Sequence, residues 1–312
     1  MVRLLALLAS ISLCQILSAQ AQTPDRRPLT AVDMIEIQRL SAAHLSPNGN
    51  YLLYKRSSTN WDENEIVRRF ELLDLSTGEQ RTAPNPDSET KSAKDAYWRP
   101  DSKAILYLKR TGDDDVVQVF EFNLQTEESQ QLTNHHTSII DVYFGAEADH
   151  FFFTATQAEQ VDDALSASED WTINAYDTPR NREVWRFEMA PRTSMPIIWG
   201  DFSIRNVSRH TSSDQLLYFK TPNHLLDVTH RGEVFVRDLT SGEDTQWTHN
   251  NYRESNPTLS PDGQTLAYIA TVNADGEPYF EDKVFVQAIG EKPQRLLADR
   301  PMEALEYAWD QA

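Results

Sequence analysis

Short runs of apolar and aromatic residues alternate with tight-turn motifs along most of the chain, and this pattern repeats. The clearest copy, TLSPDGQTLAY, runs from Thr258 to Tyr268, and two similar copies begin at His44 and Tyr97. In this motif proline presets φ, and the Asp/Asn-Gly pair tolerates the left-handed conformation. Each copy therefore predicts an antiparallel hairpin, in which a strand enters a tight turn and a second apolar strand leaves it.

Two weaker copies of the hairpin lie between the second and the third. In these, Val142–Phe144 leads to Phe151–Phe153, and Asn206–Ser208 leads to Leu216–Phe219. A second element follows each hairpin, as in Phe70–Thr82. There a half-buried strand meets a Ser/Thr-Gly turn and then a polar edge strand, so each repeat contains four predicted strands.

The spacing of the repeats decides the fold class. It is about 45–65 residues, which is typical of propeller blades, and about five repeats fit between Ser41 and Leu297. The sequence therefore predicts an all-β fold, a β-propeller of four-stranded antiparallel blades that occupies residues 41–312. An insertion over about 157–182, ahead of the strand that contains Trp185, is expected to form an extended hairpin or lobe.

The end of the chain has the pattern of one more blade. Ala304–Asp310 reads as an opening strand, with Trp309 in the place of Trp98 and Leu259 in their repeats. The sequence stops before the turn that would come next. Because an unpaired strand edge is unfavourable, we expect the propeller to be incomplete and the chain to be a fragment of a longer protein.

A short helix is predicted ahead of the repeats. Residues 22–29 read as a polar, proline-bearing linker. Thr30 can cap a helix, with Asp33 three residues later in a capping-box arrangement. One apolar face then runs from Met34 through Ile35 and Ile37 to Leu40. We expect the linker and helix to occupy residues 22–40, with the helix lying against the main domain.

The N-terminus has the features of a secretory signal peptide over residues 1–21. Arg3 precedes an apolar stretch, and Ala19 and Ala21 give the small-x-small cleavage pattern. A lipoprotein anchor at Cys14 is the competing interpretation. Cys14 is the only cysteine, so cleavage after Ala21 would leave no disulfide, thiolate metal site or cysteine nucleophile. We expect an exported protein, periplasmic or extracellular, with no membrane insertion after cleavage.

The formal net charge is −19, from 29 Lys+Arg against 48 Asp+Glu. A surface this acidic repels phosphate backbones and anionic lipid, which argues against binding to nucleic acid or to a membrane surface. The charge is interpreted either as a solubilising surface or as a preference for cationic ligands.

The Ser46–Gly49 and Ser260–Gly263 hairpins, each followed by a short strand, resemble TolB-like propeller repeats. The whole layout resembles the N-terminal half of a bacterial prolyl oligopeptidase-family serine peptidase of the acylaminoacyl-peptidase and dipeptidyl-peptidase branch. The resemblance implies a propeller that caps a C-terminal α/β-hydrolase domain and limits access to a Ser-Asp-His site. The expected substrates are peptides or small acyl compounds, with no cofactor.

No catalytic residue is assigned within the chain. The nucleophile elbow of this family needs Gly-x-Ser-x-Gly, and none of the ten glycines stands in such a motif. The Glu127-Glu128 pair falls in a predicted turn, so the amine-binding pair of the dipeptidyl branch is not supported. The segment itself is expected to be inactive, and its full-length parent to be a serine-type hydrolase.

Two alternatives stay open. The repeats fit equally well a non-catalytic TolB-like propeller that acts as a protein-binding scaffold, although the predicted helix and lobe argue against it. A propeller with its own lyase or glycosidase chemistry is the third interpretation. It would need converging carboxylate or histidine groups, and the sequence shows no such set.

The remaining candidate groups have structural interpretations, and no metal or cofactor site is predicted. His135-His136 lacks a third ligand at a suitable spacing and is interpreted as part of a solvated loop. Asp113–Asp115 is interpreted as a hairpin tip, Asn273–Gly276 as a turn, and the Asn206 sequon as part of a strand. Tryptophans expected to pack between blades are Trp98, Trp185, Trp199, Trp247 and Trp309.

Overall fold

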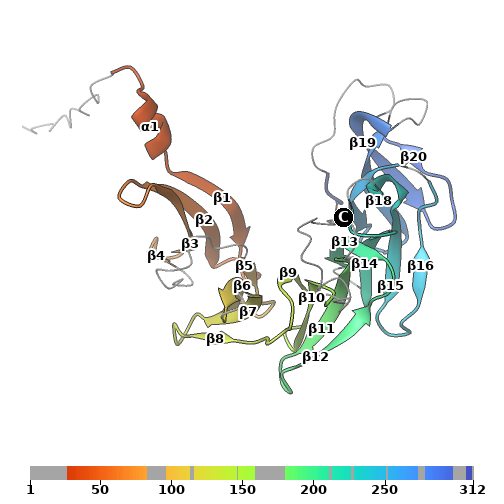
Figure 1. Ribbon diagram of the computed structural model, residues 1–312, viewed down its shortest axis with the longest axis horizontal. Helices are drawn as coiled ribbons and strands as arrows, with labels where there is room; N and C mark the ends of the chain where they lie inside the picture. Colours follow the sequence, from red (N-terminus) through yellow and green to blue (C-terminus); the bar gives the residue numbers. More distant parts are fainter. Residues whose placement is uncertain are drawn as a thin grey trace, which may run out of the picture. The chain divides into compact units, whose positions relative to one another are not determined.

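The regular secondary structure of the computed structural model is almost entirely β-strand (Figure 1). The structure describes residues 27–82, 96–112, 116–145, 147–158, 180–210, 213–225, 228–250, 252–272, 278–297 and 307–310. Within these ranges five four-stranded sheets form, each from four strands that are consecutive in the chain. The predicted β-propeller of antiparallel blades is confirmed.

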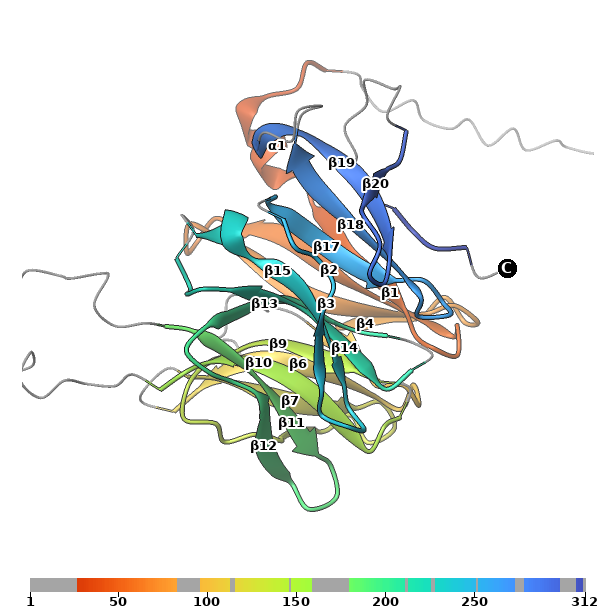
Figure 2. The same ribbon diagram turned by 90° about the vertical axis from the view of Figure 1, so that its right-hand side faces the viewer.

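The blades are numbered in chain order (Figures 1 and 2). Blade one comprises β1 (Arg39–Leu45), β2 (Tyr51–Asn60), β3 (Glu65–Asp74) and β4 (Gln80–Thr82). Blade two comprises β5 (Ala96–Trp98), β6 (Ala104–Thr111), β7 (Val116–Asn123) and β8 (Ser129–Gln131). Blade three comprises β9 (Ile139–Phe144), β10 (His150–Thr156), β11 (Arg182–Glu188) and β12 (Thr193–Ile198). Blade four comprises β13 (Ser203–Arg209), β14 (Gln215–Thr221), β15 (Glu233–Asp238) and β16 (Asp244–Gln246), with a 3₁₀ turn over Thr229–Arg231. Blade five comprises β17 (Glu254–Leu259), β18 (Thr265–Val272), β19 (Pro278–Ala288) and β20 (Gln294–Arg295).

The turn between the first two strands of a blade is built by side chains of the repeat motif. The Ser46 hydroxyl accepts a hydrogen bond from the Tyr51 amide at 3.0 Å, and the Ser260 hydroxyl accepts one from the Thr265 amide at 2.9 Å. Gly263 closes the second of these turns at a φ of +71°, a conformation that side chains with a Cβ rarely adopt. The predicted turn chemistry is therefore confirmed.

The turn between the third and fourth strands also repeats. The side-chain oxygen of Asp74 accepts hydrogen bonds from the amides two and three residues later, and those of Asn123 and Asp238 do the same. These are Asx turns, in which a short polar side chain takes the place of a backbone acceptor. Gly78 fits the left-handed position of this turn at a φ of +75°, whereas blade two has Glu127 there at +59°.

In the described part of the chain, four hydrophobic clusters lie between the sheets, and each contains residues of two consecutive blades. The strand β10 shows why. Its side chains alternate between the two faces, so Phe151 and Phe153 pack in the cluster shared with blade two. Phe152 lies between them in sequence and packs in the cluster shared with blade four. The strand is therefore apolar on both faces, as a sheet covered on both sides requires.

The first strands of three blades contain the same irregularity. The pairing of β1 with β2, of β13 with β14 and of β17 with β18 shifts register by a bulge. At each bulge a residue adopts a left-handed conformation: Ala42 at a φ of +48°, Asn206 at +47° and Asn256 at +50°. The repeat thus extends to backbone detail that the apolar pattern does not encode.

The N-terminal helix α1 spans Ala31–Glu36. Its predicted capping box is confirmed: the Asp33 amide donates to the Thr30 hydroxyl at 3.2 Å, and the Thr30 amide donates to the Asp33 carboxylate at 2.7 Å. The prediction that the helical face extends to Leu40 is wrong. Leu40 lies in β1, because pairing with Arg56 of β2 outweighs the local helical periodicity. Among the described residues, 27–37 form one compact unit, and those from Gln38 onward form another.

Several predicted segments fall outside the described residues. They are the signal peptide over 1–21 with Cys14, Asp113–Asp115, the lobe residues 159–179, Asn273–Gly276 and residues 304–306. Within the described part of the chain, no helix is long and apolar enough to cross a membrane.

Residues 307–310 contact blade five. The Trp309 indole donates to the Thr258 hydroxyl at 3.0 Å, and the Tyr307 hydroxyl donates to the Ala267 carbonyl at 2.7 Å. In blade two, the Trp98 indole donates to the His44 carbonyl of blade one at 3.2 Å. His44 and Thr258 hold the same repeat position, each just before Leu-Ser-Pro. Trp309 therefore contacts the blade before it as Trp98 does.

Candidate functional site

Among the described residues, a charged cavity and a pair of carboxyl groups lie at one end of the blades. Because neighbouring strands are antiparallel, the second strand of each blade ends where its first and third strands begin. In blade three this end carries the inserted segment, which connects β10 to β11. We call it the lobe end, and the site is built here from blades three, four and five.

The base of the inserted segment is fixed to blade four. The Gln157 amide donates to the Asn181 carbonyl at 2.8 Å and closes the base of the segment. The Gln157 side chain then donates to the Gly200 carbonyl at 3.0 Å, and the Arg182 amide donates to the Ser203 hydroxyl at 3.1 Å. These bonds hold the base of the predicted lobe against the start of β13.

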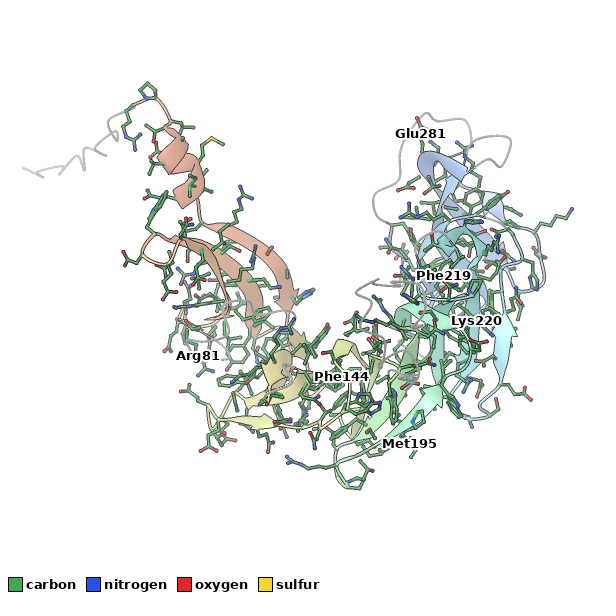
Figure 3. All side chains as sticks on the ribbon, in the orientation of Figure 1. Arg81, Phe144, Met195, Phe219, Lys220 and Glu281 are labelled. Atoms are coloured by element: carbon green, nitrogen blue, oxygen red, sulfur yellow. The ribbon has the colours of Figure 1, made fainter. Side chains whose placement is uncertain are left out.

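A cavity of about 360 Å³ opens at the lobe end of blade four. Lys220 lies in its lining between two rings, with its Nζ 4.1 Å from the centroid of Phe202 and 5.0 Å from that of Phe235. Figure 3 shows Lys220 beside Phe219 on β14. An ammonium group is attracted to the faces of aromatic rings. Arg231, Asp201 and Glu233 complete the charged part of the wall, so the cavity combines apolar and charged surfaces.

A pair of carboxyl groups lies between blades four and five, formed by the half-buried Glu233 of the cavity wall and the buried Glu254. Glu254 at the start of β17 is buried, and its carboxyl accepts hydrogen bonds from the Thr248 hydroxyl at 2.9 Å and the Asn250 side-chain amide at 2.6 Å. The Asn250 backbone amide donates to Glu233 at 2.7 Å. Burial raises the pKa of Glu254 to about 8 and also raises the pKa of Glu233.

The pair is incompletely satisfied. Among the described residues, neither the Glu233 Oε2 atom nor the hydroxyl of the fully buried Tyr268 has a hydrogen-bond partner. A buried polar atom without a hydrogen-bond partner lowers the stability of the folded state. Glu233 and Glu254 belong to no motif that the sequence shows. The available signal was Glu254 itself, a charged residue at the head of a strand whose later residues alternate into the core.

The interpretation of His135 as part of a solvated loop is wrong. Its ring is buried against Phe153 and Trp185, with centroids 5.4 and 4.8 Å away, and burial lowers its pKa. The cause is Gln118, whose side chain donates to the His135 carbonyl and accepts from its amide, both at 2.8 Å. His136 is exposed, and the described residues contain no group of three or more histidine, cysteine or acidic side chains suited to a metal ion.

The expected packing of the tryptophans holds with one exception. Trp247 is buried in the cluster of blades four and five, and Trp98 and Trp185 are partly buried against neighbouring blades. Trp199 is 59% exposed, so the prediction is wrong there. It follows β12, the last strand of blade three. Asn206 lies in β13 as predicted.

The described fold defines a β-propeller, and comparison with solved structures places it among known ones. The chain matches acylaminoacyl peptidase from Pyrococcus horikoshii with a TM-score of 0.59, at 12% identity over 87% of this chain and 41% of that one. It matches a putative TolB from Agrobacterium tumefaciens with a TM-score of 0.53, at 12% identity over 83% and 81%. It also matches an oligogalacturonate lyase in complex with manganese with a TM-score of 0.55, at 15% identity over 81% and 63%.

At these levels of sequence identity, the three matches show a similarity of fold alone. The chain spans 41% of the length of the acylaminoacyl peptidase that it matches. No protein-family model matches the sequence, and no curated protein matches it. The propeller predicted from the repeats is thus similar in fold to parts of an acylaminoacyl peptidase and of a putative TolB.

Proposed function

We propose that this chain is the propeller domain of an exported serine peptidase or related acyl hydrolase. In this proposal the propeller limits access to a C-terminal α/β-hydrolase domain and admits short peptides or small acyl substrates. The chemistry is acyl transfer through a serine nucleophile that lies outside the 312 residues. The chain itself contributes the substrate path and no catalytic group.

The anchored base of the inserted segment carries the proposal. A propeller that serves only as a scaffold has no need for an insertion fixed by Gln157 and Arg182 to the next blade. The cavity of about 360 Å³ lies at the same end, where entering substrate would pass between aromatic and charged groups. The fold similarity to acylaminoacyl peptidase supports the same assignment.

The experiment is to read the coding sequence downstream of the codon for Ala312 and to assay the encoded protein. The proposal expects further propeller repeats, a Gly-x-Ser-x-Gly elbow and then Asp and His. The longer protein should hydrolyse chromogenic acyl-peptide substrates, and substitution of the elbow serine should abolish the reaction. The purified 312-residue chain should be inactive, so hydrolysis by this chain would refute the proposal.

A TolB-like scaffold is the second candidate, because the match to the putative TolB covers 81% of that protein. The two candidates differ in the coding sequence downstream of Ala312. A reading frame that ends after one or two more repeats would replace the hydrolase proposal with the scaffold.

A further inference from the structure

Three arginines lie on, or directly before, neighbouring strands at the lobe end of blades three, four and five. Arg205 lies on β13, and its guanidinium donates to the His224 carbonyl at 2.5 Å. The amide of Arg182 is bound to Ser203, two residues before Arg205 on the same strand. Arg253 immediately precedes β17, whose strand contacts β13. Three consecutive blades thus each bring one arginine to this place.

The cluster lacks the acidic partners that several other arginines of the molecule have. Arg56, Arg99 and Arg237 each form an ion pair with a carboxylate in their own blade, at 2.6 to 2.7 Å. None of the three clustered arginines has an ion pair in the described part of the chain, although the sequence contains 48 acidic residues. Arg205 leaves its buried Nε atom without a partner, as Arg99 also does.

The three charges also affect one another. Burial lowers the pKa of Arg205, and the nearby positive charges of Arg182 and Arg253 lower it further. Like charges that are held together without counter-charges destabilise the fold unless something else neutralises them. Guanidinium groups that lack a carboxylate partner can bind an anionic acceptor.

We propose that Arg182, Arg205 and Arg253 form a binding site for the carboxylate group of a small organic ligand. Guanidinium groups bind carboxylates through two parallel hydrogen bonds. A single carboxylate fits this molecule better than a polyanion, because the net charge of −19 repels a ligand in proportion to its negative charge. If the proposed function holds, the ligand is the free C-terminal carboxylate of a short peptide; that identification rests on the proposed function, whereas the site does not.

The test uses isothermal titration of the full chain with N-acetyl-trialanine, with the same peptide carrying a C-terminal amide, and with inorganic phosphate. The free acid should bind about tenfold or more tightly than the amide, and its affinity should fall as ionic strength rises. Arg205→Met should weaken binding of the acid about tenfold or more, and Arg205→Lys should weaken it less. Arg253→Met changes an exposed side chain and should weaken binding with no loss of folding.

The matched control is Arg69→Met, which removes an exposed arginine from β3 of blade one and should leave binding unchanged. Circular dichroism identifies any variant that fails to fold. If Arg205→Met does not fold, the affinity of Arg253→Met for the acid tests the site. Equal affinity for the acid and the amide, or equal losses in Arg69→Met and Arg253→Met, would overturn the site. Tighter binding of phosphate than of the acid, with the same arginine dependence, would overturn the carboxylate assignment. These measurements need no hydrolysis, so they can succeed where the hydrolase proposal fails.

Discussion

Glu254→Gln should stabilise the protein at neutral pH. The native carboxyl of Glu254 stays protonated up to a pH of about 8, whereas the unfolded carboxyl ionises near 4.5. The glutamine keeps a neutral group of the same size. Its oxygen can accept from Asn250, and its amide can donate to Thr248, so the existing contacts are retained. The hydrogen of the Thr248 hydroxyl is then free to turn towards the unpaired Oε2 of Glu233.

The magnitude follows from the two pKa values. Because the native state holds this proton more tightly than the unfolded state, the contribution of Glu254 to stability is fully present below pH 4.5 and is lost as pH rises to about 8. A pH of 7 lies 2.5 units above the pKa of the unfolded carboxyl, which is therefore ionised, whereas the native carboxyl is still protonated. At about 1.36 kcal/mol per unit, the wild-type protein loses about 3 kcal/mol there relative to pH 4.

Equilibrium unfolding in urea, followed by tryptophan fluorescence, measures this directly, since Trp247 lies in the cluster shared by the same two blades. Glu254→Gln should be more stable than wild type by about 3 kcal/mol at pH 7 and equal to it near pH 4. Glu243→Gln removes the same charge from an exposed turn and should change stability by less than about 0.5 kcal/mol. A difference between Glu254→Gln and wild type that is the same at both pH values would refute the reasoning.

Three further substitutions test other features through the same unfolding measurement. Glu127→Gly should stabilise the protein by about 0.5–1 kcal/mol, because glycine adopts the left-handed φ of +59° without strain. The substitution also removes an exposed ion pair with Arg81, which contributes less. A loss of stability would mean that the ion pair dominates. Tyr268→Phe should stabilise by about 1 kcal/mol by removing an unpaired buried hydroxyl, and a destabilised variant would indicate a partner for that group. Ser102→Ala should cost about 1 kcal/mol, since the Ser102 hydroxyl accepts from the Asn48 amide of blade one at 3.0 Å, and no change would exclude this bond as a link between blades.

The blades were predictable from sequence because their signals are local. Each hairpin turn is specified by residues adjacent in the chain, as at Ser260–Gly263, and strand alternation then assigns the faces. The predicted end of the helix was wrong because the structure there depends on a contact between distant residues. Leu40 continues a helical pattern, and only its pairing with β2, a contact between distant residues, places it in a strand. Glu127 shows that the turn tolerates a poor residue at the glycine position.

The lobe end was not predictable beyond the existence of the insertion. Its groups come from separate repeats, as with Arg182, Arg205 and Arg253, and no spacing in the sequence indicates that they meet. The burial of His135 has the same origin, since Gln118 of β7 holds it from a distance of 17 residues. Polar groups become a site only when the blades are assembled, and a pattern within one repeat carries no information about its neighbours.

Each of the four hydrophobic clusters described above is shared by two consecutive blades, and this arrangement affects how the protein unfolds. Stability is distributed along a series of nearest-neighbour couplings, so damage to one interface weakens two blades and spares the others. Amide hydrogen exchange should then show steps of protection that change from blade to blade. A ligand at the arginine cluster would raise protection in blades three to five and leave blade one at its original rate.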